Sequence, residues 1–147
     1  MTHPAGMPLM PLPTGKLLLA STAGPLGVGL LWLVIGGLNG SWPNGLIGLW
    51  SGCIVAAVGV GTDLMVTPWR PRPATGWMNL WILHSILRVG GSIGLVILLY
   101  SASSPDPANL LFSYLACFLV GLAWGTAVWT EPLRRSGRQA TRKQQAE

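Results

Sequence analysis

The stretch WMNLWILHSILRVGGSIGLVILLYS, residues 77–101, decides the fold of this chain. It is apolar throughout except for a short polar turn around one charged residue, Arg88. An α-helix needs only about 20 apolar residues to cross the hydrocarbon core of a bilayer. Strands of a membrane barrel are about half as long and alternate apolar with polar residues, which this stretch does not. It therefore predicts a transmembrane helix.

Three further stretches have the same length and character, at residues 17–38, 45–66 and 108–129. Half of the 147 residues are hydrophobic and only 9% are charged, whereas soluble domains carry about 25% charged residues. The 8 Trp and 20 Gly fit membrane helices, because Trp anchors the interface and Gly permits close packing. The sequence predicts an all-α, integral membrane four-helix bundle over residues 17–131.

The basic residues predict how this bundle is oriented. With four crossings, Lys16, the 67–73 loop and the C-terminal segment share one end, and the two short links at the other end contain no Lys or Arg. Basic residues are retained on the cytoplasmic side of a membrane. We therefore expect two antiparallel hairpins with both termini cytoplasmic, in the inner membrane of a bacterium.

The two terminal segments and the basic loop are expected to lie outside the hydrocarbon core. Residues 1–16 are rich in proline and predict a flexible tail, and residues 132–147 predict a basic cytoplasmic tail. The formal charge of +5 is concentrated beside the membrane segments, so it indicates contact with lipid and not with nucleic acid. The residues expected to set topology or touch lipid headgroups are Arg70, Arg72, Arg134 and Arg135.

Arg88 is the residue that composition does not explain. An Arg at the centre of a membrane helix costs at least about 2.5–3.5 kcal/mol, which makes it a functional candidate. His84 and Ser92, four residues to either side, share its helix face. Two interpretations stay open: Arg88 reaches the headgroups or pairs within the bundle, or it contacts a partner or an ion. Asp63 is its natural ion-pair partner, with Glu131 as a second candidate.

His84 is the second member of the polar stripe. Histidine titrates near neutral pH and can relay protons, but we expect no acidic residue within the membrane beside His84, and therefore no relay. The apolar stretches offer no second His to complete a metal cluster, and the sequence has no carboxylate pair and no phosphate loop. We therefore expect neither a catalytic site nor a metal or cofactor, and a chain that is not an enzyme.

Glycines four residues apart recur in the apolar stretches. Such pairs let helix backbones approach closely, within one bundle or against a partner, including a second copy of the chain. The pairs expected to pack helices are Gly48 with Gly52, Gly90 with Gly94, and Gly121 with Gly125.

The layout resembles subunit I of bacterial F-type ATP synthases, a family of small, basic, four-helix membrane proteins. The similar segments are Lys16-Leu-Leu-Leu, GLIGLWSG at residues 45–52, the basic loop, and LHSILRVGGSIGLVILL at residues 83–99. Family members often carry a basic residue early in the third helix, followed by an apolar run, and Arg88 is similar. Some members have an acid three residues before it; Ser85 stands there in this chain, which disfavours an ion-binding role.

The resemblance implies a non-catalytic role. Subunit I is associated with assembly of the rotor ring of c subunits, and a link to magnesium supply has been proposed for the family. We therefore expect a membrane accessory protein that assists assembly of the c-ring through helix–helix contacts, with Arg88 engaging an acidic membrane residue of a partner. The alternative is a small oligomeric transporter or channel subunit, with a cation such as magnesium as one possible substrate.

Overall fold

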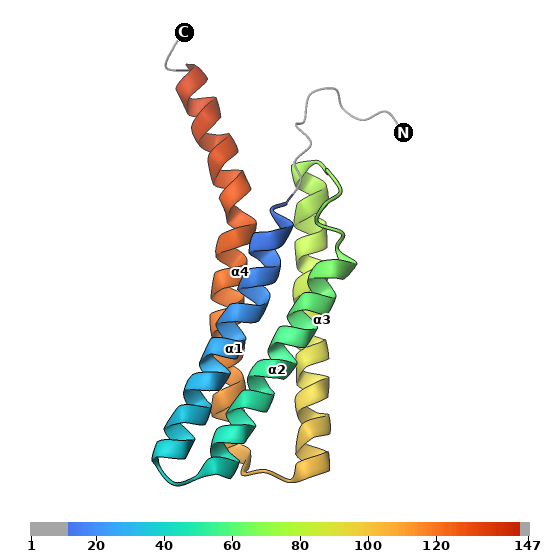
Figure 1. Ribbon diagram of the computed structural model, residues 1–147. Coiled ribbons are helices and arrows are strands. Elements are labelled where there is room, and N and C mark those ends of the chain that lie inside the picture. Colours follow the sequence, from blue (N-terminus) through green and yellow to red (C-terminus); the bar gives the residue numbers. More distant parts are fainter. Residues whose placement is uncertain (1–11, 145–147) are drawn as a thin grey trace.

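The computed structural model describes residues 12–144, and the side chains of residues 12–73 and 75–131. This part of the chain forms four helices and no strands (Figure 1): α1 (Thr14–Leu38), α2 (Trp42–Met65), α3 (Ala74–Ser103) and α4 (Pro107–Gln144). Each contains a segment long and apolar enough to cross a membrane. The all-α four-helix fold predicted from the sequence is confirmed.

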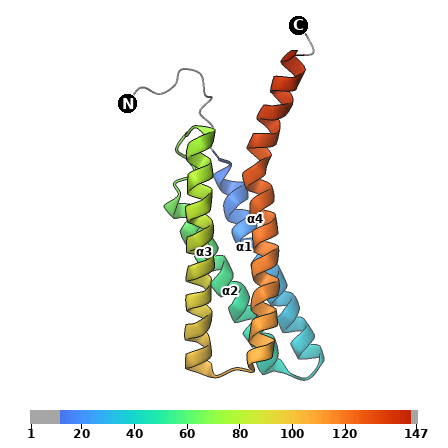
Figure 2. The same cartoon turned by 180° about the vertical axis from the view of Figure 1, so that it is seen from behind.

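The helices form two hairpins, α1 with α2 and α3 with α4, and both hairpins open toward the same end of the bundle. The start of α1, the link between α2 and α3, and the continuation of α4 lie at the same end, and the other two links lie at the opposite end (Figures 1 and 2). Lys16, Arg70 and Arg72 therefore gather at one end, which we call the basic end.

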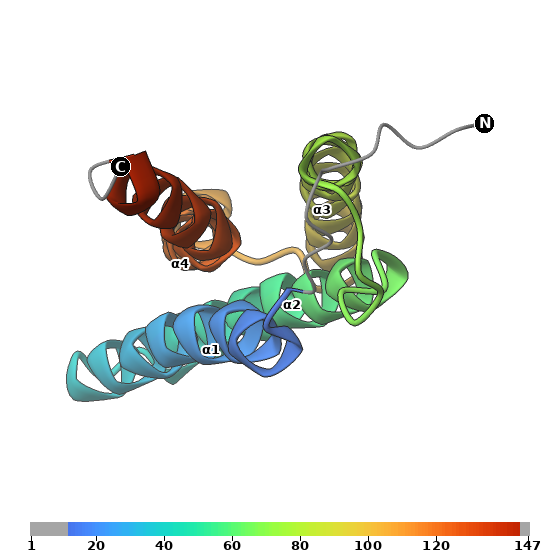
Figure 3. The same cartoon turned by 90° about the horizontal axis from the view of Figure 1, so that it is seen from above.

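The helices are not equally attached to one another. α1 and α2 pack together as one layer, and α3 and α4 lie on the same face of that layer (Figure 3). α3 and α4 make little direct contact with each other. Only 17% of the apolar segment of α3 is buried in the bundle, against 44% for α2. α3 is therefore the helix that this chain covers least.

Glycines bring the backbones of α1 and α2 into direct contact. A Cβ atom added to Gly36 would lie 2.6 Å from both N and Cα of Gly45. One added to Gly52 would lie 2.7 Å from the carbonyl oxygen of Pro25 and 3.2 Å from Cα of Gly29. Real Cβ atoms do not approach backbone this closely, so the α1–α2 interface depends on these glycines.

The helix ends differ from the predicted bounds for local reasons. α2 begins at Trp42 and not at 45, because Pro43 is tolerated in a first helical turn, where its missing N–H is not needed. α3 begins at Ala74 and not at 77, because the carbonyl of Pro73 already accepts a bond from Trp77 N.

Helices extend into both predicted tails. α4 runs without a break to Gln144, so most of the predicted tail 132–147 is helical, and residues 145–147 lie outside the described residues. α1 begins at Thr14, within the predicted tail 1–16, of which residues 1–11 lie outside the described residues.

The first turn of α4 is capped by Asp106. Its side-chain Oδ2 accepts a hydrogen bond from Asn109 N at 3.1 Å, at a helix end where backbone N–H groups lack helical partners. Asp106→Ala should lower the free energy of unfolding by about 1 kcal/mol, as measured by denaturation in detergent micelles. Asp106→Asn keeps an acceptor and should restore most of the loss; equal losses for Ala and Asn would contradict the cap.

Candidate functional site

Asp63, in the last turn of α2, is the centre of a buried polar group. Its side chain has 0% exposure. Oδ2 accepts a hydrogen bond from Ser21 Oγ of α1, and Oδ1 lies 2.8 Å from His84 Nε2 of α3. Each carboxylate oxygen is therefore occupied, and three helices meet at one side chain.

The expectation that no acid lies beside His84 is wrong. It counted only the residues of the third apolar stretch, whereas Asp63 comes from the neighbouring helix. α3 starts beyond the end of α2 (Figure 1), so a residue well inside α3 lies level with the last turn of α2. The two side chains that can exchange a proton are thus in direct contact.

Ser21 is a site residue that the sequence did not reveal. It stands four residues before Pro25, which has no N–H to bond to the Ser21 carbonyl. Pro25 is itself fully buried and faces Gly121 of α4, where a Cβ would lie 2.9 Å from Pro25 Cγ. The available signal was a hydroxyl residue one turn before a proline inside an apolar helix, a position where the helix ladder is locally open.

Arg88 lies one turn along α3 from His84 and points into the bundle. Its side chain is only 3% exposed. The guanidinium is surrounded by glycines of α2 and α4. Added Cβ atoms would lie 2.8 Å from Nη2 at Gly121, 3.2 Å from Nη1 at Gly125, and 3.4 Å from Nη2 at Gly59. Gly121 and Gly125 thus make room for a charged side chain, and Gly59 joins them without having been predicted.

Arg88 has fewer partners than its charge requires. Within the described residues, Nε and Nη2 are buried and donate to no hydrogen-bond partner, and no carboxylate lies within ion-pair distance. Asp63 is near enough to attract Arg88 electrostatically, but its oxygens bond Ser21 and His84. Glu131, the second candidate acid, lies 3.3 Å from Lys16 at the basic end.

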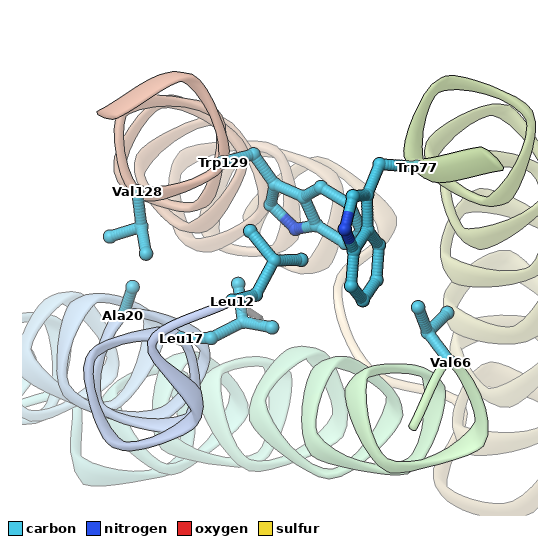
Figure 4. Packing of buried hydrophobic residues seen from close by; sticks show 7 residues of the cluster. All are labelled: Leu12, Leu17, Ala20, Val66, Trp77, Val128 and Trp129. Carbon is cyan, nitrogen blue, oxygen red and sulfur yellow. The ribbon is translucent and has the colours of Figure 1, made fainter. Parts of the chain in front are cut away.

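Two tryptophans close the site toward the basic end. The Trp129 ring of α4 lies 5.6 Å from the His84 ring and 5.8 Å, edge to face, from the Trp77 ring of α3. Figure 4 shows the two indoles together between α3 and α4. They belong to an apolar cluster whose other buried members are Leu12, Leu17, Ala20, Val66 and Val128. Trp129 is the other site residue that sequence reasoning missed.

The remaining predicted residues lie outside this group. Arg70 is exposed at the basic end, whereas Arg72 donates to Thr67 Oγ1 at 2.8 Å and stands over the Trp77 ring. Arg134 and Arg135 lie on the continuation of α4, and their side chains are outside the described ones.

The six predicted glycines fall into three groups. Gly48 and Gly52 pack against α1, and Gly121 and Gly125 face Arg88. Gly90 and Gly94 are exposed on α3, and among the described residues no atom lies within 4 Å of a Cβ added at either.

Ser21, Asp63, His84 and Arg88 form one buried group, which we call the polar centre. The charges of its members nearly balance. With neutral His84 it holds one negative and one positive charge, and a proton on His84 makes it positive. Among residues 12–144 no three His, Cys, Asp or Glu side chains lie together as metal ligands. The geometry therefore permits proton transfer between His84 and Asp63, and gives Arg88 the capacity to hold an acceptor.

No family model, curated protein or solved structure matches the chain. Fold and site together define a multi-pass helical membrane protein with an enclosed, charged polar centre.

Proposed function

We propose that the chain is a non-catalytic accessory protein of the membrane that acts through helix–helix contact, assisting assembly of the c-ring of ATP synthase. The observation that carries the proposal is the outer face of α3, where Gly90 and Gly94 have no neighbour within the described chain. The choice of the c-ring as partner rests on the resemblance of residues 16–130 to subunit I.

The outer face of α3 has the form that close helix pairing requires. Gly90 and Gly94 alternate with the exposed side chains of Ile86, Ile93 and Ile97 at spacings of three and four residues. Residues at these spacings lie on one side of a helix. Glycines between branched side chains leave a groove into which a second helix fits closely, and van der Waals packing drives such association in lipid.

Arg88 has a different place in this proposal from the one expected. It faces the interior, away from the Gly90–Gly94 face, so it does not meet a partner's acid there. Its role would be to hold α3 against the glycines of α2 and α4, and so to fix the direction in which the outer face points.

The proposal predicts that filling the groove blocks assembly while leaving the fold intact. In Gly90→Leu/Gly94→Leu, the recovery of assembled c-ring on co-expression should fall at least about tenfold, the effect of losing about 1.4 kcal/mol of contact energy. Gly27→Leu is a matched control, because Gly27 is exposed on α1 and has nothing within 4 Å of its Cβ position. Unchanged ring recovery with a correctly inserted double variant would refute the proposal.

The polar centre favours a second candidate, a small oligomeric transporter or channel subunit. Ionisable residues inside membrane segments often mark ion or substrate pathways. Magnesium is a poor fit at this site, because Arg88 repels cations and Asp63 is already engaged by Ser21 and His84. Ion flux into liposomes that contain the purified chain alone, abolished by Asp63→Asn, would support this candidate; an absence of flux would leave the accessory role.

A further inference from the structure

We infer that the polar centre is a binding site for a small inorganic anion of halide size, taken up together with a proton on His84. The carrying observation is that Arg88 is 3% exposed while its Nε and Nη2 groups have no acceptor among the described residues. A guanidinium has five N–H donors and no acceptor, so each buried N–H needs an acceptor from elsewhere.

The described part of the chain does not supply the missing acceptor. The nearest carboxylate, Asp63, is bonded to Ser21 and His84 and lies outside ion-pair distance of the guanidinium. The walls that contact the guanidinium are Gly59, Gly121 and Gly125, which carry no side-chain acceptor. A charged donor left without a partner in a low-dielectric interior is strongly destabilising. The site is therefore complete only when an acceptor occupies it.

The size of the acceptor follows from the closeness of these walls. The guanidinium already lies 2.8 Å from where a Cβ at Gly121 would be, so there is no space there for a planar carboxylate or a phosphate. α3 and α4 are bridged beside Arg88 by side chains, the Ser92–Tyr114 hydrogen bond of 2.8 Å and the His84–Trp129 ring contact. The inference requires that such side chains rotate to admit a single-atom ion, which does not require a helix to break.

The charge balance links the anion to a proton. Asp63 and Arg88 cancel each other, so an added anion leaves the polar centre one charge negative. A proton on His84, which already contacts Asp63, restores neutrality. The groups placed against the guanidinium, Gly59 on α2 and Gly121 and Gly125 on α4, carry no charge, and neither does Ser21 on α1, which lies beside Gly59. Lys16 and Glu131 pair with each other at the basic end.

Anion and proton therefore strengthen each other's binding. By linkage, a proton that improves anion affinity must be held more tightly when the anion is bound. As rising pH removes the proton from His84, the apparent affinity for the anion should fall, by up to about tenfold per pH unit. This inference concerns the isolated chain and does not depend on a role in ATP synthase assembly.

The test uses the purified full chain in lipid nanodiscs and chloride as the probe. Sodium chloride replaces sodium gluconate at constant ionic strength while the thermal unfolding midpoint is followed at about pH 6 and about pH 8, on either side of the histidine range. We expect a saturable rise of the midpoint with chloride, half-complete at a lower concentration at the lower pH. His84→Gln should keep the chloride response and lose its pH dependence.

Two further variants assign the response to Arg88. Arg88→Gln should lose the chloride-dependent rise of the unfolding midpoint. Arg70→Gln, which removes an exposed charge, should keep this rise. Should Arg88→Gln not fold, Gly121→Ala presses on Nη2 without removing the charge and should weaken chloride binding several-fold, whereas Gly27→Ala should not. An Arg88 that is satisfied by water alone gives no saturable chloride response in the wild-type chain, and that result overturns the inference.

Discussion

Asp63→Ala is expected to lower the free energy of unfolding by about 3–5 kcal/mol, the cost of leaving a buried charge without compensation. The substitution leaves Ser21 and His84 without their shared acceptor and removes the negative charge nearest to Arg88. The remaining positive charge is buried with nothing to compensate it. Denaturation in detergent micelles, followed by helix content, measures the loss.

Asp63→Asn separates the two causes of this loss. The amide keeps the size of the side chain and an oxygen acceptor, but not the charge. A smaller loss for Asn than for Ala would assign the difference to the hydrogen bonds with Ser21 and His84. If Asp63→Ala cost no more than Asp106→Ala at the exposed start of α4, the polar centre would contribute nothing to stability and the argument would be wrong.

Gly52→Ala is expected to lower the free energy of unfolding by about 1–3 kcal/mol through overpacking of the α1–α2 interface. The new methyl group would lie 2.7 Å from the Pro25 carbonyl oxygen and 3.2 Å from Cα of Gly29. Both are backbone atoms, which cannot rotate away as a flexible side chain can. The two helices must therefore move apart along much of their contact.

Gly27→Ala provides the matched comparison for this prediction. The chemical change is the same, but Gly27 lies in open space, so only the higher helix propensity of Ala remains, worth up to about 1 kcal/mol in favour of the fold. The two variants should thus change stability in opposite directions in the same unfolding experiment. Destabilisation of the same size in both would show that close backbone contact is not what Gly52 provides.

The fold was predictable because its causes are local. Four apolar stretches of bilayer length, separated by links rich in Pro, Gly and Asn, permit few arrangements other than a four-helix bundle. The first residues of the helices were not predicted correctly. Pro43 and Pro73 were taken as parts of links, yet a proline is tolerated at the start of a helix, and α2 and α3 begin there.

The sequence indicated which charged and titratable residues belong to the site, but not which of them are in contact. Asp63, His84 and Arg88 are conspicuous as polar residues in an apolar chain, but which of them touch depends on the relative height of α2 and α3. The Thr67–Pro73 link sets that height, and it places His84, and not Arg88, on Asp63. Ser21 and Trp129 were missed because hydroxyls and indoles are ordinary in membrane helices, and only packing distinguishes these two.

α4 continues past its apolar segment without a break. It is a single helix of 38 residues, about 57 Å long, while the hydrocarbon core is about 30 Å thick. Trp129, whose ring covers His84, lies on this helix about 22 Å from Gln144 along the helix axis. Near Trp129 this helix is tied to the start of α1 by the ion pair of Glu131 with Lys16. The indole that covers His84 is therefore carried by the same helix that continues beyond the apolar segment, so the buried polar centre and the far end of α4 belong to one element.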